Sequence, residues 1–391
     1  MTNLPQGWEK FNFDNIFYSP SSKNYQLNTK DYLEKGCIPI IDQSKKFIIG
    51  YSNDYEKVFK INNCNNSCII FGDHTRVLKF IDFDFIVGAD GVKILLNKDI
   101  ERFNTKFLFF QLLYKDIPLL GYRRHFSVLK QSTFSIPPLK EQERIVGILD
   151  ESFAKIDESI KILEQDLLNL DELMQSALQK AFNPLKDNVK ENYKLPQSWE
   201  WKSLGEIGEI ITGTTPSKNN PNFYGNEYPL FKPSDLNGDI IIKYASDNLS
   251  KLGFDNARNL PKNTILIVCI GASIGKVGLS GANGSCNQQI NAIIPNSKFL
   301  PKFLFFLCSS NYFQEILKNN ASQATLPIIN KTEFSKLQIP LPPIKEQEQI
   351  TSHLDELSSH VKNLKQNYQA QIKDLQELKN SLLDKAFKGK L

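Results

Sequence analysis

Polar and basic side chains in two separate stretches of the chain have the types that contact nucleic acids. Arg and Lys can bond a guanine edge and Asn or Gln an adenine edge in the major groove, and Lys and Arg also bind the phosphates that provide much of the affinity. Each residue taken singly is equally an ordinary surface or turn group, so the set needs independent support. The candidates are Arg76, Lys79, Lys93, Arg123, Arg124 and His125 in the first stretch, and Lys232, Ser273, Lys276, Asn287, Gln288, Gln289 and Asn291 in the second.

The sequence contains only weak matches to the motifs of catalytic sites. The segment GASIGKVG resembles a phosphate-binding loop, but only three residues separate Gly271 from Gly275, and Val277 stands where Ser or Thr would hold magnesium. Asp73 and His74 are adjacent, and adjacent strand residues point to opposite faces, so an exposed turn is favoured over a catalytic dyad. The chain shows no Cys-His nucleophile pair and no HExxH zinc helix.

Length and composition describe an ordinary globular protein. At 391 residues, with 41% hydrophobic and 23% charged residues, the chain is too long for one core, so we expect two or more domains. It has no apolar run of membrane-spanning length, and the start MTNLPQGWEKF lacks the features of a signal peptide, so we expect a cytoplasmic protein with no membrane partner. Of six cysteines only Cys64 and Cys68 lie close together, which predicts reduced thiols rather than a metal site.

An internal repeat organises the whole chain. The phrase IPPLKEQERIVGILDE at 136–151 returns as LPPIKEQEQITSHLDE at 341–356, an offset of 205 that also relates SALQKAF to SLLDKAF. Upstream, LPQGWEK returns as LPQSWEW at an offset of 191, and KFLFFQLL returns as KFLFFLCS at an offset of 196. A period this long indicates a duplicated domain rather than a solenoid.

Each copy ends in a long predicted helix. Two prolines and an acidic first turn favour a helix start at each repeated phrase, and an apolar heptad pattern follows over 140–182 and 345–391. The first helix would be a rod of roughly 65 Å at about 1.5 Å per residue. Lys365 and Lys379 interrupt the second pattern, and the alternative is that each helix only covers the core of its own domain. The predicted seam and docking residues are Ile145, Leu149, Ile156, Ile160, Leu163, Leu167, Leu170, Ile350, Leu354, Val361, Leu364, Ile372, Leu375 and Leu382.

The two blocks that precede the helices are predicted to be compact α/β domains over 1–139 and 183–344. Short β-branched and aromatic runs broken by Gly, Asp and Asn predict strands and turns in both blocks. The net charge is +4 in each block, −5 over 140–182 and +1 over 345–391, so positive charge is concentrated in the two blocks. The predicted fold is α+β: two similar α/β domains separated by two long antiparallel helices in a coiled coil, related by a pseudo-twofold repeat.

The doubled order of these motifs resembles the specificity subunit of type I restriction-modification systems. The resemblance covers nearly the whole chain and rests on PQGWE and PQSWEW, PPLKEQERI and PPIKEQEQI, GDHTR with GADGVK, and GASIGKVG with NQQINAIIP. It implies that each block is a target-recognition domain reading one half of a split, asymmetric target in double-stranded DNA. It also implies that the helices are spacers that dock two methyltransferase (modification) subunits, through which restriction subunits join.

The resemblance further implies a subunit without catalytic residues or metal. S-adenosylmethionine, ATP and magnesium would then belong to the partner subunits, in agreement with the absence of an NPPF-like adenine-methylation motif from this sequence. Two alternatives stay open. One is a restriction enzyme component with a hidden nuclease or methyltransferase centre in a variable block, with Asp73, Asp82 and Asp84 as metal ligands. The other is a structural coiled-coil dimeriser with no role on DNA.

Overall fold

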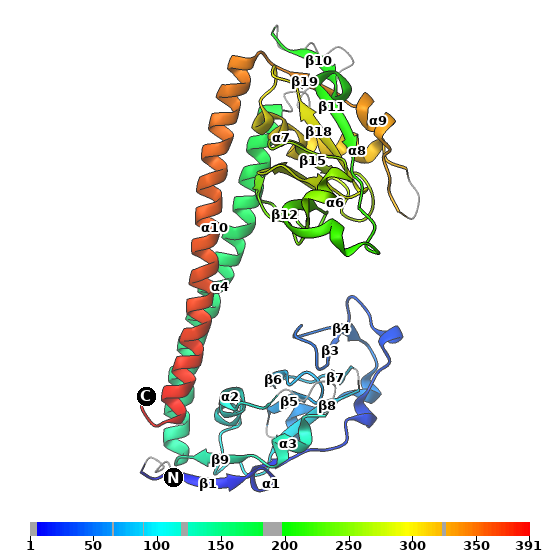
Figure 1. Ribbon diagram of the computed structural model, residues 1–391. Coiled ribbons are helices and arrows are strands. Elements are labelled where there is room, and N and C mark those ends of the chain that lie inside the picture. The colour runs from blue at the N-terminus through cyan, green and yellow to red at the C-terminus, as the bar shows by residue number, and fades with distance from the viewer. Residues whose placement is uncertain (1–5, 65, 89, 119–123, 183–197, 323–325) are drawn as a thin grey trace. The chain divides into compact units, whose positions relative to one another are not determined.

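Two compact units make up the part of the chain that the computed structural model describes, which is residues 6–64, 66–88, 90–118, 124–182, 198–322 and 326–391. Unit 1 comprises Met1–Leu163 and Gln369–Leu391, and unit 2 comprises Glu164–Tyr368. Two long helices, α4 (Leu139–Phe182) and α10 (Ile344–Phe387), each contribute one part to unit 1 and the other part to unit 2 (Figure 1). No helix within the described ranges is both long and apolar enough to cross a membrane.

Besides its parts of α4 and α10, the described residues of unit 1 form three small sheets and three short α-helices. Its antiparallel four-stranded sheet has the order β2 (Phe17–Tyr18), β8 (Val92–Asn97), β5 (Cys68–Gly72), β6 (Leu78–Ile81). A three-stranded sheet has the order β4 (Gly50–Ser52), β3 (Ile38–Ile41), β7 (Ile86–Val87), and β1 (Glu9–Asn12) pairs with β9 (Thr133–Ile136). The helices are α1 (Phe13–Ile16), α2 (Thr105–Tyr114) and α3 (Phe126–Lys130), with 3₁₀ turns at Lys23–Tyr25, Thr29–Asp31, Tyr55–Lys57 and Ile61–Cys64.

The described residues of unit 2 form a related set of sheets together with several short helices. Its five-stranded sheet has the order β11 (Gly208–Thr212), β18 (Ile290–Pro295), β15 (Ile265–Val268), β16 (Val277–Ser280), β13 (Ile241–Ile242). A three-stranded sheet has the order β14 (Asp247–Leu249), β12 (Tyr224–Phe231), β17 (Ser285–Cys286), and β10 (Glu200–Ser203) pairs with β19 (Gln338–Leu341). The helices are α5 (Leu204–Ile207), α6 (Lys251–Asp255), α7 (Pro301–Ser309), α8 (Asn311–Asn319) and α9 (Lys331–Lys336), with a 3₁₀ turn at Pro221–Phe223.

The strand pairings of the two units correspond and so reveal the duplication. The hairpin of β5 and β6 beside β8 matches the hairpin of β15 and β16 beside β18. The parallel pair β3 and β7 matches the parallel pair β12 and β17, and each of these sheets has one antiparallel neighbour, β4 or β14. The ribbon of β1 and β9 matches that of β10 and β19. The central strands β5 and β15 are buried along their whole length, as expected for strands covered on both faces.

The repeated phrase contains a glutamine that is buried in both copies. In unit 1, Gln142 Oε1 accepts a hydrogen bond from the backbone N–H of Asn104 at 2.8 Å. Its Nε2 donates to the carbonyl oxygens of Pro137 at 2.8 Å and Arg102 at 2.9 Å. Asn104 is the residue that caps the start of α2. The Gln142 amide therefore joins the first turn of α4 to the start of a helix in the globular part of unit 1.

Gln347 makes the matching connection in unit 2. Its Oε1 accepts from the backbone N–H of Leu300 at 3.1 Å, and its Nε2 donates to the carbonyl of Pro342 at 2.9 Å. Leu300 precedes α7, the counterpart of α2. The repeated phrase is visible in the sequence, but its letters alone do not show this function of the glutamine. Gln142 and Gln347 thus have equivalent positions in the two units.

The start of each long helix is also held to its own repeat by an ion pair. Lys106 of α2 lies 2.8 Å from Asp150 of α4, and Lys302 of α7 lies 2.7 Å from Asp355 of α10. Leu149 and its counterpart Leu354 are buried in the cores of units 1 and 2. These contacts show that the helix starts do cover their own domains.

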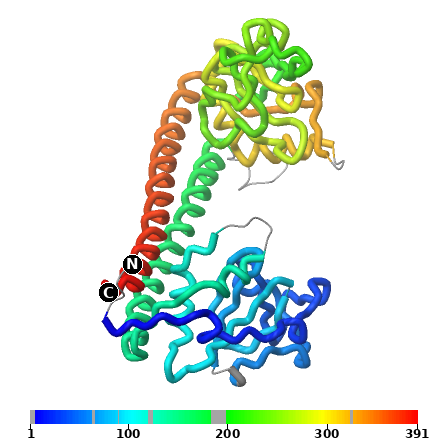
Figure 2. The backbone as a smooth tube through the Cα atoms, turned by 60° about the horizontal axis from the view of Figure 1, so that its bottom comes forward, coloured from blue at the N-terminus to red at the C-terminus, as the bar shows by residue number. Residues whose placement is uncertain are grey.

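The end of each long helix completes the core of the opposite repeat. Phe387 of α10 packs against Phe107 of α2 in unit 1, and Phe182 of α4 packs against Phe303 of α7 in unit 2, with ring centroids 5.4 Å apart in both pairs. Figure 2 shows the start of α4 beside the end of α10 in unit 1. Other residues of these helix ends lie in the same cores: Leu383 and Ala386 in unit 1, and Leu178 and Ala181 in unit 2. Neither repeat therefore closes its core alone.

The two lysines that interrupt the second heptad pattern have acidic partners on the first helix. Lys379 pairs with Asp157 in unit 1, and Lys365 pairs with Asp171 in unit 2. Asp157 and Asp171 are separated along α4 by as many residues as Lys365 and Lys379 are along α10. The two helices therefore pair in the same antiparallel register in unit 1 and in unit 2. The ammonium of Lys379 also lies 4.8 Å from the centre of the Phe153 ring.

Burial along the predicted seam is uneven. Leu364 is 40% exposed and lies outside the packed seam, because it belongs to a neighbouring stripe of the helix. The buried members are Ile145, Leu149, Ile156, Leu170, Leu354 and Val361, and the partly buried members are Ile160, Leu163, Leu167, Ile350, Ile372, Leu375 and Leu382.

Candidate nucleic-acid interface

Three loops of unit 1 meet at one edge of its sheets. We call residues 42–48, 73–77 and 90–91 the unit 1 loop cluster. Gln43 connects them: its Oε1 accepts from the backbone N–H of His74 at 3.1 Å, and its Nε2 donates to the carbonyl of Asp90 at 2.8 Å. Thr75 Oγ1 donates to the carbonyl of Gln43 at 2.6 Å. The loop after β3, the β5–β6 turn and the start of β8 therefore form one surface.

The backbone of this cluster is tightly constrained. A Cβ on Gly91, which has a φ of +83°, would lie 2.8 Å from Gln43 Nε2, and a Cβ on Gly72 would lie 2.3 Å from Thr75 Oγ1. Arg76 has a φ of 61°, a left-handed conformation that is uncommon for a residue with a side chain. Its guanidinium donates to the carbonyl of Ile117. Strained backbone of this kind is concentrated at functional sites.

Asp73 anchors the unit 1 loop cluster from inside and is 2% exposed. Its Oδ1 accepts from the backbone N–H of Phe126 at 2.8 Å, and its carbonyl accepts from the backbone N–H of His125 at 2.8 Å. Lys93 Nζ lies 3.8 Å from Asp73 Oδ2. The carboxylate therefore fixes the start of α3 against the β5–β6 turn, which is a structural role.

The three aspartates of the metal hypothesis are not brought together. Asp73 lies in the turn before β6, whereas Asp82 and Asp84 follow the other end of that strand. Asp84 Oδ1 accepts from the backbone N–H of Ile61 at 2.8 Å. Among the described residues, no group of three His, Cys, Asp or Glu side chains has a metal-binding arrangement.

Four of the predicted base readers have buried side chains, and direct contact between these side chains and bases stays a prediction. His125 is 0% exposed with Nδ1 2.9 Å from the carbonyl of Asp73, and Lys79 is 3% exposed. Asn287 is 8% exposed and donates to Gln289 Oε1, and Asn291 is 3% exposed and accepts from Thr212 Oγ1. Sequence patterns mark these side chains as polar, but their orientation is set by the strands and turns that carry them.

Other predicted readers of unit 1 lie at the surface of the cluster or close to it. Arg76 and Lys93 are half-buried and Arg124 is exposed, while Arg123 lies outside the described residues. The prediction missed the loop 42–48, in which Lys45 and Lys46 are exposed and Phe47 is 45% exposed. The available signal was the basic pair in DQSKKF, directly after a buried strand.

Unit 2 builds a second cluster from the corresponding loops, residues 232–235, 269–276 and 286–290. The carbonyl of Phe231 accepts from the backbone N–H of Asn287 at 3.0 Å, and Cys269 N–H donates to the carbonyl of Gln289 at 2.8 Å. Lys276 Nζ donates to the carbonyl of Pro233 at 3.4 Å. The loops after β12, between β15 and β16, and before β18 thus meet at one edge.

Exposure and bonding differ among the predicted readers of unit 2. Lys276 and Gln288 are exposed, and Gln288 Oε1 accepts from Thr215 Oγ1 at 2.9 Å. Ser273 and Gln289 are half-buried. Lys232 forms an ion pair with Asp247, and its hydrogen bond is the main reason that the pKa of Asp247 is lowered.

The glycines of GASIGKVG serve the turn between β15 and β16. Gly271 and Gly275 have φ values of +96° and +94°, which favour glycine. A Cβ on Gly275 would also lie 2.1 Å from Gln314 Oε1. The positions of these two glycines are therefore explained by backbone conformation and packing.

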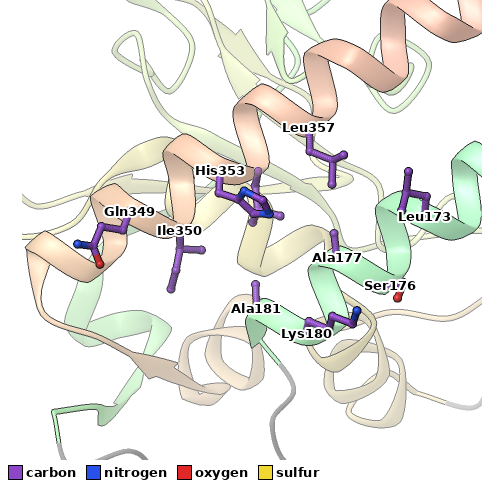
Figure 3. A pocket seen from close by; sticks show the side chains of 10 residues that line it. Leu173, Ser176, Ala177, Lys180, Ala181, Gln349, Ile350, His353 and Leu357 are labelled. Atoms are coloured by element: carbon purple, nitrogen blue, oxygen red, sulfur yellow. The ribbon is translucent and has the colours of Figure 1, made fainter.

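Apolar hollows lie between the long helices. In unit 2, a pocket of about 600 Å³ is lined by Leu173, Ala177, Ile350 and Leu357, with His353 among its polar groups (Figure 3). In unit 1, Ile162, Leu163 and Leu375 line an open groove of about 470 Å³. Ile162 is 55% exposed and Leu173 is 49% exposed, so these helix faces carry apolar surface.

Comparison with known protein families decides the classification. The family model for the type I restriction modification DNA specificity domain matches residues 5–167 and 196–374. The chain belongs to this family. The type I restriction enzyme EcoR124I/EcoR124II specificity subunit of Escherichia coli is 26% identical over 344 residues, which are 86% of this chain and 83% of that protein. The HindI specificity subunit of Haemophilus influenzae is 32% identical over 206 residues, 50% of this chain and 42% of that protein.

Solved structures show that this member has the fold of the type I specificity family. A chain from a study of the assembly and conformational transition of a type I restriction-modification system superposes with a TM-score of 0.73 at 21% identity, over 100% of both chains. The HsdS subunit of Thermoanaerobacter tengcongensis gives a TM-score of 0.50 at 20% identity, over 99% of this chain and 98% of that chain. The α+β fold with an internal repeat, and the resemblance drawn from the repeated phrases, are confirmed.

Proposed function

We propose that this type I specificity subunit reads a split, asymmetric target in double-stranded DNA, one half with each loop cluster. The observation that carries the proposal is that two clusters occupy equivalent positions in duplicated units but differ in their exposed side chains. The unit 1 cluster exposes Lys45, Lys46 and Phe47 and has the exposed Arg124 beside it in unit 1, whereas the unit 2 cluster exposes Gln288 together with Lys276. Because different side chains favour different base edges, the two halves of the target differ in sequence.

The lysines and arginines of both clusters have two separable roles under this proposal. Contacts to phosphates position each unit on the duplex and make affinity fall with salt. Contacts to base edges give selectivity, and a good bidentate contact discriminates by about 1–3 kcal/mol. Arg124 is the natural base-contact candidate in unit 1, because Arg76 already donates to the Ile117 carbonyl.

We propose that the long helices dock modification (methyltransferase) subunits, likewise two in number. The supporting features are the apolar pocket of unit 2 and the apolar groove of unit 1, which a partner's helices can cover. The subunit itself supplies no catalytic group. S-adenosylmethionine, ATP and magnesium act in the partner subunits, and restriction subunits join through the modification subunits.

The test is to assemble the full-length chain with its cognate modification subunits and to map every methylated base. Exchanging residues 1–139 for those of another family member should change one half of the target and leave the other half intact. A complex that methylates DNA without sequence preference contradicts the proposal. Magnesium-dependent cleavage by the chain alone would instead support a hidden nuclease.

Docking is tested separately with Leu173→Glu, which places a charge in the unit 2 pocket. The exposed and more polar position Lys161 on the same helix provides the control Lys161→Glu. Leu173→Glu should lower the number of modification subunits that co-purify with each chain from two to one, while the control keeps two. Equal binding by both variants contradicts docking at this pocket.

A further inference from the structure

Lys79, which the sequence suggested as a base reader, lies behind the loop 42–48 rather than on its surface. It is carried by β6 and is 3% exposed. Its Nζ donates to the carbonyl of Lys46 at 2.7 Å and to that of Phe47 at 3.3 Å, and it lies 3.7 Å from Asp42 Oδ1. Asp42 begins the loop and Phe47 lies near its end. One ammonium group thus contacts both ends of the loop.

The arrangement turns the backbone of the loop inward and leaves its side chains outside. The carbonyls of Lys46 and Phe47 point to the Lys79 ammonium, whereas the side chain of Lys46 is exposed and that of Phe47 is 45% exposed. Asp42 also folds the loop start, since its Oδ1 accepts from the backbone N–H of Ser44 at 2.8 Å. The loop is therefore held from within by acceptors that share a single donor group.

Burying this ammonium has a free-energy cost. Lysine is almost never fully buried unless its charge has partners, and burial lowers the pKa of Lys79. The site fits that rule because every contact named for Nζ is a carbonyl or carboxylate oxygen. An apolar residue on β6 would avoid the cost but would leave the loop carbonyls without this donor.

Unit 2 uses a looser form of the same arrangement. Lys276 directly precedes β16, the counterpart of β6, and its Nζ donates to the carbonyl of Pro233 at 3.4 Å. Pro233 lies in the loop after β12, the counterpart of β3. Lys276 is exposed, however, and Lys79 is buried with two carbonyls and a carboxylate. The lysine with more contacts to the loop is therefore in unit 1, whose loop 42–48 carries the exposed Lys45 and Lys46.

We propose that Lys79 is a positioning residue for DNA selectivity, fixing the loop 42–48 so that Lys45, Lys46 and Phe47 meet one half of the target in a single conformation. The inference rests on the proposed function. A loop already ordered in the free protein loses less conformational entropy on binding, and fixed donors discriminate better between correct and incorrect bases. Lys79 acts through the loop and touches no base.

The test compares Lys79→Met, which keeps the stem and removes the ammonium, with Lys79→Arg, which keeps the charge. Lys10→Met is the control, because Lys10 is exposed on β1 outside the cluster. Each variant is assembled with the modification subunits, and methylation rates are measured on the target and on targets with one substitution in either half. Lys79→Met should lower discrimination in the unit 1 half at least tenfold and change it less than twofold in the other half. Lys79→Arg should recover most of the loss, and Lys10→Met should match wild type.

Unchanged discrimination in folded Lys79→Met, or an equal loss in both halves, overturns the inference. If Lys79→Met does not fold, hydrogen exchange of the wild-type chain decides. The amide of Ser44, which donates to Asp42 Oδ1, must already be protected without DNA, and its exchange at the rate of an unstructured peptide overturns the inference. A wild-type complex without sequence preference would instead overturn the proposed function, so the two failures are distinguishable.

Discussion

Replacing Gln142 by leucine should detach the start of α4 from unit 1 at a predictable cost. The side chain is 0% exposed and makes three hydrogen bonds, to the N–H of Asn104 and to the carbonyls of Arg102 and Pro137. At about 1 kcal/mol for each bond, the loss is about 3 kcal/mol. Gln347 makes two such bonds, so Gln347→Leu should cost about 2 kcal/mol in unit 2.

Hydrogen exchange on the full-length chain measures both costs locally. A loss of about 3 kcal/mol accelerates exchange through this opening roughly 150-fold, and a loss of about 2 kcal/mol roughly 30-fold. The affected amides should lie in the first turns of α4 and α2 for Gln142→Leu, and of α10 and α7 for Gln347→Leu. Glu143→Ala is the control, because Glu143 is exposed in the same turn and should change stability by less than about 0.5 kcal/mol. Exchange in Gln142→Leu equal to that in Glu143→Ala would refute the reasoning, as would a larger effect from Gln347→Leu.

Three further perturbations address the helix ends, the helix pair and the buried thiols. Phe182→Ala should cost about 3–5 kcal/mol in urea unfolding, and Phe387→Ala less because its ring is only partly buried; equal, negligible costs would contradict the shared cores. Lys379→Met should change stability by less than about 1 kcal/mol, because the ion pair that it removes is partly exposed; a larger loss in the same assay would show that the pair is essential. Burial raises the pKa of the Cys269 and Cys286 thiols to about 12. Between about pH 8.5 and 12 these thiols therefore lose their protons only in the unfolded state. Over this range the free energy of unfolding falls by about 1.4 kcal/mol per pH unit for each thiol. Replacing both cysteines by alanine should flatten the slope of unfolding free energy against pH, and an unchanged slope would contradict this assignment.

Structural features that depend on residues close together in the sequence could be predicted without the structure. The prolines and acidic turn of PPLKEQERI and the heptad spacing after it indicated two long helices, because both signals depend on residues a few positions apart. The same alignment identified the repeat. The unexpected pairing of Lys379 with Asp157 was not accessible, since it depends on the register of two segments far apart in the chain.

The interface was less accessible than the fold, because residue type does not determine where a side chain points. Lys79 and Arg124 look equivalent as basic residues, yet one is buried against loop carbonyls and the other is exposed. The loop holding Lys45 and Lys46 was overlooked because its only signal is a basic pair after a strand. Its importance follows from three loops converging on Gln43, a contact set that the sequence does not contain.

The exchange of helix ends between repeats imposes an order on synthesis. The ring of Phe107 in α2 packs against Phe387, which the ribosome adds only after all of unit 2. Part of the apolar core of unit 1 therefore stays open until the end of α10 has left the ribosome. In unit 2, Phe182 is synthesised before its partner Phe303, so this contact involves no comparable delay. The repeat translated first is therefore the one whose core is completed last, and during that interval its open core is apolar surface of the kind that is prone to aggregation.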